Sequence, residues 1–364
     1  MTTRPFGTFF LPGPTEVRAE ILAAMLQPMI SHRSAAFEAL YARCDEGMRR
    51  VFRTTRPVFI SSSSATGLME AAVRNAPAGP ILSLVNGAFS ARFAEIAHAC
   101  ARTVEVLEVP YGEVVPLETV EHALRERRFA AVTAAHCETS TGAAQDVQAI
   151  AELAHANGAF SLIDSVSGML GMSVETDAWA LDFVLTGSQK ALAIPPGLAF
   201  CCVSHRYLAS AGSAPARGKY FDILEFAQYA AKHQTPNTPA VSLFYALDAQ
   251  LAAIGPTGVE CRWARHAAMA ATMHAWVESQ RKEGRLQGIL APCGARSNTV
   301  TVVKTRDGTD ARDVVEKVGA RGFTLGPGYG KLAATTFRVG HMGDHTVETL
   351  SRLLDVVGEV LGEG

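Results

Sequence analysis

Residues 185–190 read Leu-Thr-Gly-Ser-Gln-Lys, and they carry a short apolar run, Phe183–Leu185, to a lysine that stands just before the turn Pro195–Gly197. The run predicts a buried strand with Lys190 at its C-terminal end. Ligands of open α/β sheets bind outside the carboxyl ends of the strands, and an amine there can form a Schiff base with an aldehyde. The alternative is a solvated lysine at a strand end, which is the commoner case in proteins.

Similar apolar runs alternate with stretches of helical period, of which Val147–Asn157 is an example, with Asp146 as its expected cap and Gly158 as its expected stop. Several of the runs are apolar on both faces, as in sheets covered by helices on both sides. The pattern predicts an α/β fold with a large domain built on a mostly parallel seven-stranded sheet. The expected strands are Val58–Ile60, Ile81–Val85, Val104–Val109, Ala130–Ala135, Phe160–Ile163, Phe183–Leu185 and Leu198–Val203.

After Pro239 the pattern changes to two long helices, expected at Ala240–Ile254 and Val259–Gln280. A smaller β-α-β-α unit follows, with its elements at Thr299–Thr305, Ala311–Gly319, Thr335–Val339 and Thr346–Leu361. We therefore expect a large domain over residues 21–250 and a smaller C-terminal α+β domain over residues 251–364. Residues 1–20 are expected to form an N-terminal segment that contributes to the functional site and to the small domain.

Composition argues for a small-molecule ligand, because the net charge is −2 and no run of Lys or Arg suggests nucleic acid or a membrane. The N-terminal sequence resembles neither a signal peptide nor a membrane span, so we expect a cytoplasmic protein. Seven scattered cysteines without a C-x-x-C pair indicate no disulfide framework and no zinc ribbon, and Cys201 and Cys202 are expected in the core. His341 and His345 flank Gly343, which favours a loop, so no metal site is expected.

A carboxylate follows another apolar run one βα step before Lys190, in the sequence Ser161–Ser165. Pyridoxal phosphate (PLP) acts as an electron sink when its pyridine nitrogen is protonated, and an anionic carboxylate beside that nitrogen favours the charged form. Asp164 suits this role. The alternative is that Asp164 caps the following turn.

The hydroxyl-rich segment Ser61–Gly67 lies between a predicted strand and a predicted helix. The start of such a helix offers free N–H groups and the positive end of the helix dipole, which together can bind a phosphate. The segment contains neither G-x-G-x-x-G nor G-K-[ST], so it does not indicate a dinucleotide or a nucleoside triphosphate. An ordinary Ser/Thr cap is an equally good interpretation of the segment taken alone.

Together these motifs resemble those of the class V, fold-type I PLP-dependent aminotransferases, in particular the alanine-glyoxylate and serine-pyruvate group. The resemblance covers nearly the whole chain, and its motifs occur in the family's order. They are Pro12–Thr15, Ser64–Glu70, Asn86–Gly87, His136–Gly142, Asp164–Val166, Ser188–Lys190, Thr238–Pro239 and Phe337–Gly340.

The resemblance implies that Lys190 is the Schiff-base lysine and that Asp164 is the partner of the pyridine nitrogen. It implies a phosphate site formed by Ser64, Ala65, Thr66 and Gln189. Thr139 would contact the cofactor near its phenolic oxygen, and Phe89 would stack on its ring, where close relatives often have Trp. Arg338 would bind the substrate carboxylate, and Pro14 would lie in the substrate site.

Two positions depart from the family pattern. Ala65 stands where relatives carry Gly, and its methyl group limits how closely the backbone can approach a phosphate. In His233–Pro239, which in the family reaches the phosphate of the neighbouring subunit, Asn237 stands where a hydroxyl residue is expected. Thr235 or Thr238 could replace it. The resemblance implies a homodimer whose active sites are shared between subunits.

The expected function is ping-pong transamination between a small amino acid, alanine or serine, and a small 2-oxo acid, glyoxylate or pyruvate. An aminophosphonate transaminase would keep the same cofactor residues. A cysteine-desulfurase-type lyase is disfavoured, because Phe89 and Gln189 stand where such enzymes commonly have histidine and Cys293 lacks supporting context. A non-catalytic PLP-binding protein is disfavoured as well, since binding alone needs neither Lys190 nor Asp164.

Overall fold

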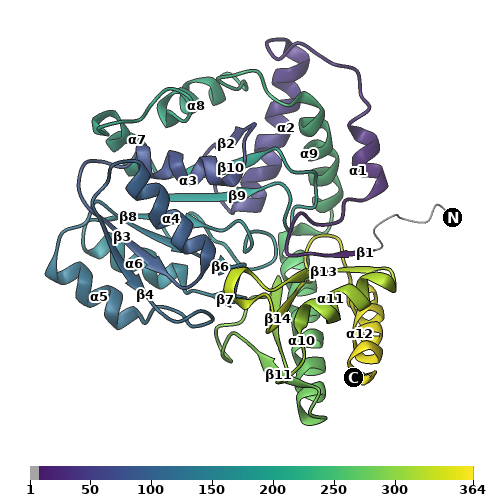
Figure 1. Ribbon diagram of the computed structural model, residues 1–364. Helices are drawn as coiled ribbons and strands as arrows, with labels where there is room; N and C mark the ends of the chain where they lie inside the picture. Colours follow the sequence, from purple (N-terminus) through teal and green to yellow (C-terminus); the bar gives the residue numbers. More distant parts are fainter. Residues whose placement is uncertain (1–7, 364) are drawn as a thin grey trace.

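A seven-stranded sheet forms the centre of the computed structural model, which describes residues 8–363 (Figure 1). Its strand order is β2-β10-β9-β8-β5-β3-β4, and β10 alone runs antiparallel to its neighbours. Each predicted strand is confirmed to within two residues at either end. The strands are β2 (Val58–Ser61), β3 (Ile81–Val85), β4 (Val104–Glu108), β5 (Ala131–Ala135), β8 (Phe160–Asp164), β9 (Phe183–Gly187) and β10 (Ala199–Val203).

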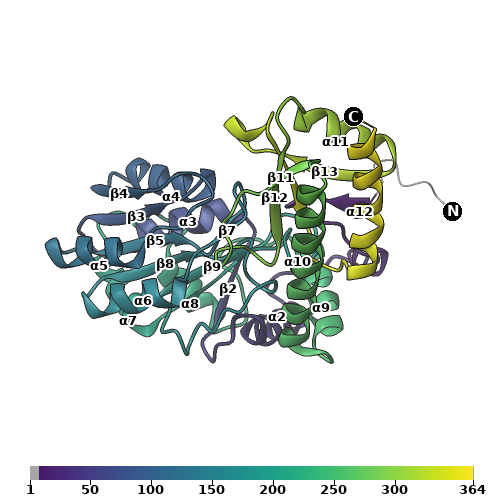
Figure 2. The ribbon, with the colours of Figure 1, turned by 90° about the horizontal axis from the view of Figure 1, so that it is seen from below.

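Helices cover both faces of this sheet, with α3 and α4 on one face and α5 and α6 on the other (Figure 2). The predicted start of α6 is confirmed, because the Asp146 carboxylate accepts a hydrogen bond of 3.0 Å from the N–H of Ala149. Gly158 follows the helix with φ +74°, a conformation that favours glycine. The helices are α3 (Ala65–Arg74), α4 (Ala88–Ala99), α5 (Leu117–Glu126), α6 (Val147–Ala156), α7 (His205–Ser210) and α8 (Ile223–Ala230), with a 3₁₀ turn at Ala211–Ser213.

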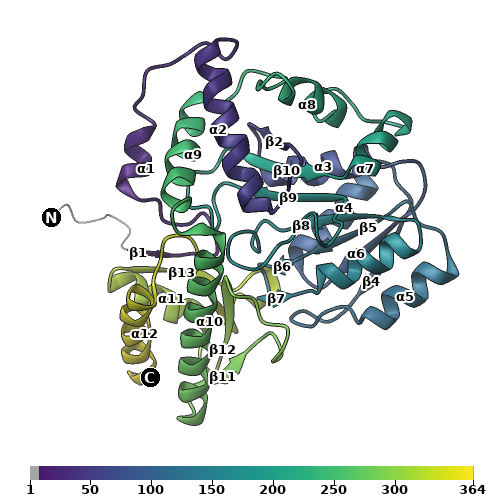
Figure 3. The same cartoon turned by 180° about the vertical axis from the view of Figure 1, so that it is seen from behind.

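Four further helices lie beside the sheet and connect it to the rest of the molecule (Figure 3). Helices α1 (Ala19–Ala24) and α2 (Ala35–Phe52) both pack against α9 (Val241–Ile254), and α10 (Gly258–Lys282) continues to the smaller sheet. The two long helices predicted after Pro239 are thus confirmed. Residue 250, where we expected the domain boundary, lies inside α9.

The smaller sheet has five strands in the order β1-β13-β14-β12-β11, so the four elements of the expected β-α-β-α unit are present and three further strands join them. The predicted pair are β12 (Val300–Thr305) and β14 (Thr336–Gly340), and the predicted helices are α11 (Ala311–Ala320) and α12 (Val347–Gly362). The strands β1 (Thr8–Phe10), β11 (Leu286–Ile289) and β13 (Phe323–Pro327) were missed, because such short strands show little periodicity.

The N-terminal segment joins this smaller sheet, since β1 pairs in parallel with β13 and Thr8 lies opposite Phe323. Phe10 is fully buried in the core of the small domain with Val303, Phe337 and Leu353. Burying one such side chain contributes about 1.5–3 kcal/mol to stability. Residues 1–7 of the predicted segment 1–20 lie outside the described part of the chain.

The positions predicted for two cysteines and two histidines are confirmed. Cys201 and Cys202 are buried in β10, and His341 and His345 lie in the loop between β14 and α12. Among residues 8–363, no group of three or more His, Cys, Asp or Glu side chains could hold a metal ion. Over the same residues, no helix is long and apolar enough to cross a bilayer.

Candidate active site

Most of the predicted site residues converge on one edge of the central sheet, because β2, β5, β8 and β9 all end there. Strand β8 ends in Asp164, and the turn after β9 carries Lys190. A cavity of about 310 Å³ lies at this edge. Its lining includes Pro14, Ser64, Ala65, Thr66, Phe89, Thr139, Asp164, Gln189 and Lys190, and also Gly13, Met69, Arg92, Val166 and Pro196, which the sequence analysis did not single out as site residues.

Lys190 is buried, and its ammonium group donates a hydrogen bond to the carbonyl oxygen of Pro12. Burial lowers the pKa of Lys190 to about 8. A larger fraction of this amine is therefore neutral near pH 7 than of a solvated lysine, and only the neutral amine has the lone pair that attacks an aldehyde. The structure excludes the alternative of a solvated lysine.

The N-terminal segment passes directly over Lys190. Thr15 holds it there, since its N–H donates to the Gln189 carbonyl at 3.0 Å and its hydroxyl donates to the Lys190 carbonyl at 3.0 Å. A Cβ added to Gly13 would lie 2.5 Å from Lys190 Nζ, and Gly13 has φ +112°. Only glycine allows this approach, so the segment forms one wall of the cavity.

Asp164 is buried at the end of β8, where its carboxylate accepts a hydrogen bond of 2.8 Å from the N–H of Val166. Burial raises the pKa of Asp164 to about 7, although this hydrogen bond opposes the shift. A buried carboxylate with so few donors is stabilised in its charged form by a cation that enters the cavity. The hydrogen bond to Val166 shows that Asp164 also caps the local turn, so the two interpretations are compatible.

The start of α3 forms a second wall. Ser64 occupies the N-cap position, but its hydroxyl makes no capping hydrogen bond, and Ser64 and Thr66 are both exposed. The Gly67 N–H donates to the Ser64 carbonyl at 3.0 Å, but the N–H groups of Ala65 and Thr66 have no acceptor within the helix, so they and the two hydroxyls are available to an anion. The methyl group of Ala65 is buried, and a Cβ added to Gly187 would be 3.5 Å from it.

Glu138 holds Phe89 in place, a role that the sequence did not reveal. This fully buried carboxylate accepts hydrogen bonds from the N–H groups of Phe89 at 3.1 Å and Ser90 at 2.8 Å, and from the Ser140 hydroxyl at 2.6 Å. It thereby caps the first turn of α4. A Cβ added to Gly87 would lie 2.4 Å from the Glu138 side chain, so this packing requires glycine there.

Arg338 lies in β14 of the small domain and reaches the large domain. Its Nε donates to the Pro327 carbonyl at 2.8 Å, and its Nη1 donates to the Thr139 carbonyl at 3.3 Å. Burial lowers the pKa of Arg338, while Tyr329 and Glu138 oppose the shift. Within residues 8–363, no carboxylate forms an ion pair with Arg338, so this guanidinium can accept the carboxylate of a ligand. Arg338 is not among the residues that line the cavity, but Thr139, to which it donates, is one of them.

The segment after α8 contributes no lining residue to the cavity of its own chain. Thr235 is buried, and its hydroxyl donates to the Asn237 carbonyl at 2.7 Å. Asn237 and Thr238 are exposed. Neither Thr235 nor Thr238 lines the cavity beside Lys190.

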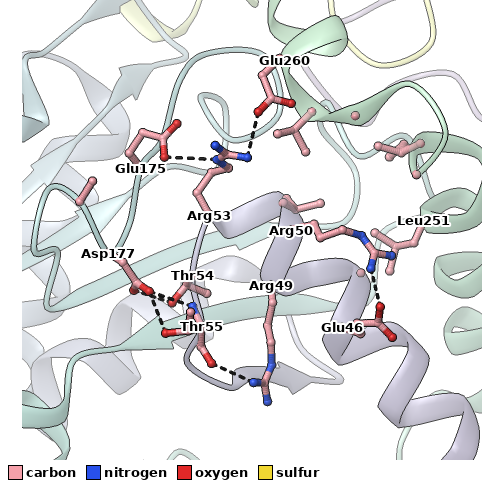
Figure 4. Close-up of a pocket in the computed structure, with 17 residues that line it drawn as sticks. Glu46, Arg49, Arg50, Arg53, Thr54, Thr55, Glu175, Asp177, Leu251 and Glu260 are labelled. Carbon is pink, nitrogen blue, oxygen red and sulfur yellow. Dashed lines mark hydrogen bonds and ion pairs between the residues drawn. The ribbon is translucent and has the colours of Figure 1, made fainter.

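A larger cavity of about 620 Å³ lies near the N-terminal ends of β2 and β9, away from Lys190 and Asp164 (Figure 4). Its cations are already paired, since Arg53 bonds to Glu175 at 3.2 Å and to Glu260 at 2.8 Å. Ligands of open α/β sheets bind at the carboxyl ends of the strands. We therefore assign the smaller cavity as the candidate active site, because it holds the buried amine and the buried carboxylate.

Comparisons with known proteins agree with this geometry. The family model "Aminotransferase class-V" matches residues 18–331. The chain is 32% identical over 350 residues to the L-aspartate–glyoxylate aminotransferase of Paracoccus denitrificans, an alignment that covers 93% of this chain and 86% of the relative. It is 30% identical to the serine–glyoxylate aminotransferase of Arabidopsis thaliana, with 92% and 85% covered.

Among solved structures, an alanine–glyoxylate aminotransferase from Nostoc sp. superposes with a TM-score of 0.90 and 30% sequence identity. The superposition covers 98% of this chain and 96% of the Nostoc chain. The similarity therefore extends over both sheets.

Proposed function

This chain belongs to the class V aminotransferases, and from that premise we propose that it transfers the amino group of alanine or serine to glyoxylate or pyruvate, using PLP bound at Lys190. One observation carries the proposal. A buried amine of lowered pKa and a buried carboxylate of raised pKa line the same small cavity. Arg338, which has no carboxylate partner among residues 8–363, donates a hydrogen bond to the lining residue Thr139. Perturbed groups gathered in one cleft are typical of active sites.

The residues present fit PLP. Lys190 is the covalent anchor, and Asp164 is the buried anion that a protonated pyridine nitrogen would stabilise. The start of α3, with Ser64 and Thr66, suits the phosphate, and Phe89 offers a flat apolar face to the ring. When bound, PLP supplies an aldehyde that carries the amino group and a ring that withdraws electrons.

The chain's own groups then position the substrate and move one proton. Arg338 binds the α-carboxylate, which fixes the orientation of the α-carbon. The Lys190 amine would remove the proton from that carbon as a general base and then, as a general acid, would deliver it to the carbon that comes from the cofactor's aldehyde. Asp164 keeps its negative charge beside the ring, and the wall formed by Gly13 and Pro14 limits the access of water.

Small substrates suit the cavity, since about 310 Å³ is at the lower end of the range of ligand pockets. The relatives named above from Paracoccus and Arabidopsis carry glyoxylate in their names, which supports glyoxylate as an acceptor. Within residues 8–363, no cysteine lines the cavity, and this observation lends no support to a desulfurase.

The half-reactions test the function directly. We expect a yellow protein whose colour is bleached by alanine or serine and restored by glyoxylate or pyruvate. A panel of amino donors against both acceptors, scored by kcat/KM, identifies the preferred pair. Protein that binds PLP but keeps its colour with every donor would contradict the proposal, and so would a preference for aminophosphonates over amino acids.

We predict that Arg338→Lys raises KM for every amino acid and 2-oxo acid. A lysine cannot reproduce the planar guanidinium, and losing one charge-assisted hydrogen bond costs about 1.5–3 kcal/mol, roughly a tenfold to hundredfold rise. Steady-state kinetics with several substrates measure the change. Arg312→Lys, on the exposed face of α11, is the matched control and should leave KM unchanged. A defect confined to one substrate would remove Arg338 from this role.

We also propose a homodimer in which each active site receives residues from the His233–Pro239 segment of the other subunit. The exposed apolar side chains near α1 support a contact there, since Leu26 is 84% and Met29 is 73% exposed. Clustered apolar side chains on a surface often mark an interface. The exposed positions of Asn237 and Thr238 leave both free to reach a second chain.

Assembly and cofactor binding should then be coupled, because PLP would bind mainly to the dimer. Light scattering across a dilution series, with and without PLP, measures this coupling. We expect Leu26→Asp to shift the equilibrium toward monomer, and Val106→Asp, at an exposed position on the edge strand β4, to leave it unchanged. A monomer that stays fully active at every concentration would contradict shared sites.

The proposed location is the cytoplasm. All seven cysteines are free thiols in the structure, which suits a reducing compartment.

A further inference from the structure

Tyr329 lies between the two domains and contacts three residues at the candidate active site. Its hydroxyl accepts a hydrogen bond of 3.3 Å from Nη2 of Arg92 in α4. Its ring centroid is 5.4 Å from that of Phe89, with the planes tilted by 49°, and the Arg338 guanidinium carbon lies 5.4 Å from the same ring. The ring thus bridges the proposed cofactor-stacking residue and the proposed carboxylate-binding residue.

The loop that carries Tyr329, between β13 and β14, is anchored on both sides. The N–H of Gly328 donates to the Thr336 carbonyl at 2.9 Å, and a Cβ added to Gly328 would lie 2.2 Å from the Leu332 carbonyl oxygen. Gly330 has φ +54° and starts a 3₁₀ turn, Gly330–Leu332. Lys331 places its ammonium group 4.1 Å from the centre of the Tyr111 ring in the large domain. These contacts hold the Tyr329 ring in a defined position.

Arg92 further restricts the Tyr329 ring. The Arg92 guanidinium carbon lies 4.8 Å from the centre of the Phe89 ring, so the cation is stacked on one aromatic residue and hydrogen-bonded to the other. Because Arg92 lines the cavity and Glu138 fixes the start of α4, this arrangement belongs to the wall of the site. Rotation of the Tyr329 ring away from the site would break the hydrogen bond to Arg92.

We propose that Tyr329 is a specificity-determining residue that limits the length of the substrate side chain. A substrate whose carboxylate binds Arg338 and whose amino group reaches the region above Phe89 has the Tyr329 ring beside it, since that ring contacts both residues. Tyr329 is not among the residues that line the cavity of about 310 Å³, but its ring contacts Phe89 and Arg92, which do line it. We therefore expect the ring to limit the space beside them to the side chain of alanine or serine. This inference rests on the proposed transaminase function.

The first test compares kcat/KM for alanine, 2-aminobutyrate and norvaline, with glyoxylate as acceptor. One methylene group in an apolar pocket typically changes kcat/KM by about tenfold or more. We expect Tyr329→Ala to raise the ratio of norvaline to alanine by at least about tenfold over wild type. Tyr329→Phe keeps the ring and loses only the hydrogen bond to Arg92, so it should retain the wild-type preference for short side chains.

Lys331→Ala is the matched control, because it removes the contact between the same loop and Tyr111 but keeps the Tyr329 side chain. An unchanged ratio in Tyr329→Ala would overturn the inference. It would also be overturned if Lys331→Ala or Tyr329→Phe changed the ratio as much as Tyr329→Ala does, since loop anchoring or the hydrogen bond would then set the limit. Thermal unfolding of each variant checks that the fold is retained.

A second measurement does not depend on turnover. Calorimetric titration measures the affinity for propanoate, butanoate and pentanoate. These acids carry no amino group, so differences among them reflect only the length of the side chain. We expect wild-type affinity to fall with length and Tyr329→Ala affinity to rise with length, as added apolar surface is buried. If wild-type protein exchanges no amino group with any donor, the proposed function fails. If the wild-type protein does exchange amino groups, but wild type and Tyr329→Ala bind the three acids with the same order of affinity, only the role of Tyr329 fails.

Discussion

Replacing Lys190 with alanine is expected to lower kcat by at least about 1,000-fold, because the variant loses both the covalent anchor and the group that moves the proton. The fold should survive. The amine is buried and its charged form is disfavoured there, so its removal deletes one hydrogen bond, to the Pro12 carbonyl, and no ion pair of the described residues. Single-turnover and steady-state assays measure the loss, and thermal unfolding measures stability.

Two control variants make the Lys190 result specific. Lys317→Ala removes an exposed lysine on α11 and should change neither the rate nor the colour of the protein. Lys190→Arg keeps a cation of similar length but offers no neutral amine at accessible pH, so it should be as inactive as the alanine variant. Activity of Lys190→Ala within about tenfold of wild type would refute the assignment, since one lost proton-transfer group alone typically costs more.

Asp164→Asn is expected to lower kcat by about 100- to 1,000-fold, comparable to the loss of other preorganised charge-stabilising groups. The amide is nearly isosteric but carries no negative charge, so the ring nitrogen would lose the anion that favours its protonated form. Because burial already raises the pKa of Asp164 to about 7, we expect Asp164 in protein without PLP to lose its negative charge as the pH decreases below 7. PLP should oppose that loss, because the protonated ring nitrogen favours the carboxylate.

Asp182 provides a matched control for Asp164, since it is also a buried carboxylate of the central sheet. It lies before β9, at the opposite edge from Lys190, where it forms an ion pair with Arg206 and accepts a hydrogen bond of 3.0 Å from the Ser161 N–H. Asp182→Asn should lower the melting temperature and leave kcat unchanged. If Asp164→Asn instead kept the wild-type kcat and lost only stability, Asp164 would be a structural cap.

Most of the large domain could be predicted from the sequence, because its strands are continuous apolar runs that need no partner to be recognised. The carboxyl ends of parallel strands meet at one edge of a sheet. Asp164 ends one strand and Lys190 follows another, so the sequence predicts that they lie close together. The start of α6 was also predictable, because the capping residue Asp146 bonds to a backbone N–H only three residues later in the chain.

The small domain was only partly predictable. Strand β1 has three residues, too few to show a period, and it forms only by pairing with β13, more than 300 residues later in the chain. Such pairings depend on which surfaces meet, and local propensity carries little information about them.

What the sequence by itself determined is the order of the main elements, the edge of the sheet that carries chemistry, and the identity of its amine and its carboxylate. Only the tertiary structure decided how buried these groups are, and burial is what moves the pKa of Lys190 to about 8 and that of Asp164 to about 7. It also brought Glu138, Arg92 and Tyr329 to the site from three different elements. Desolvation and side-chain contacts arise only when the chain folds, because most of the neighbours of a buried group are distant from it in the sequence.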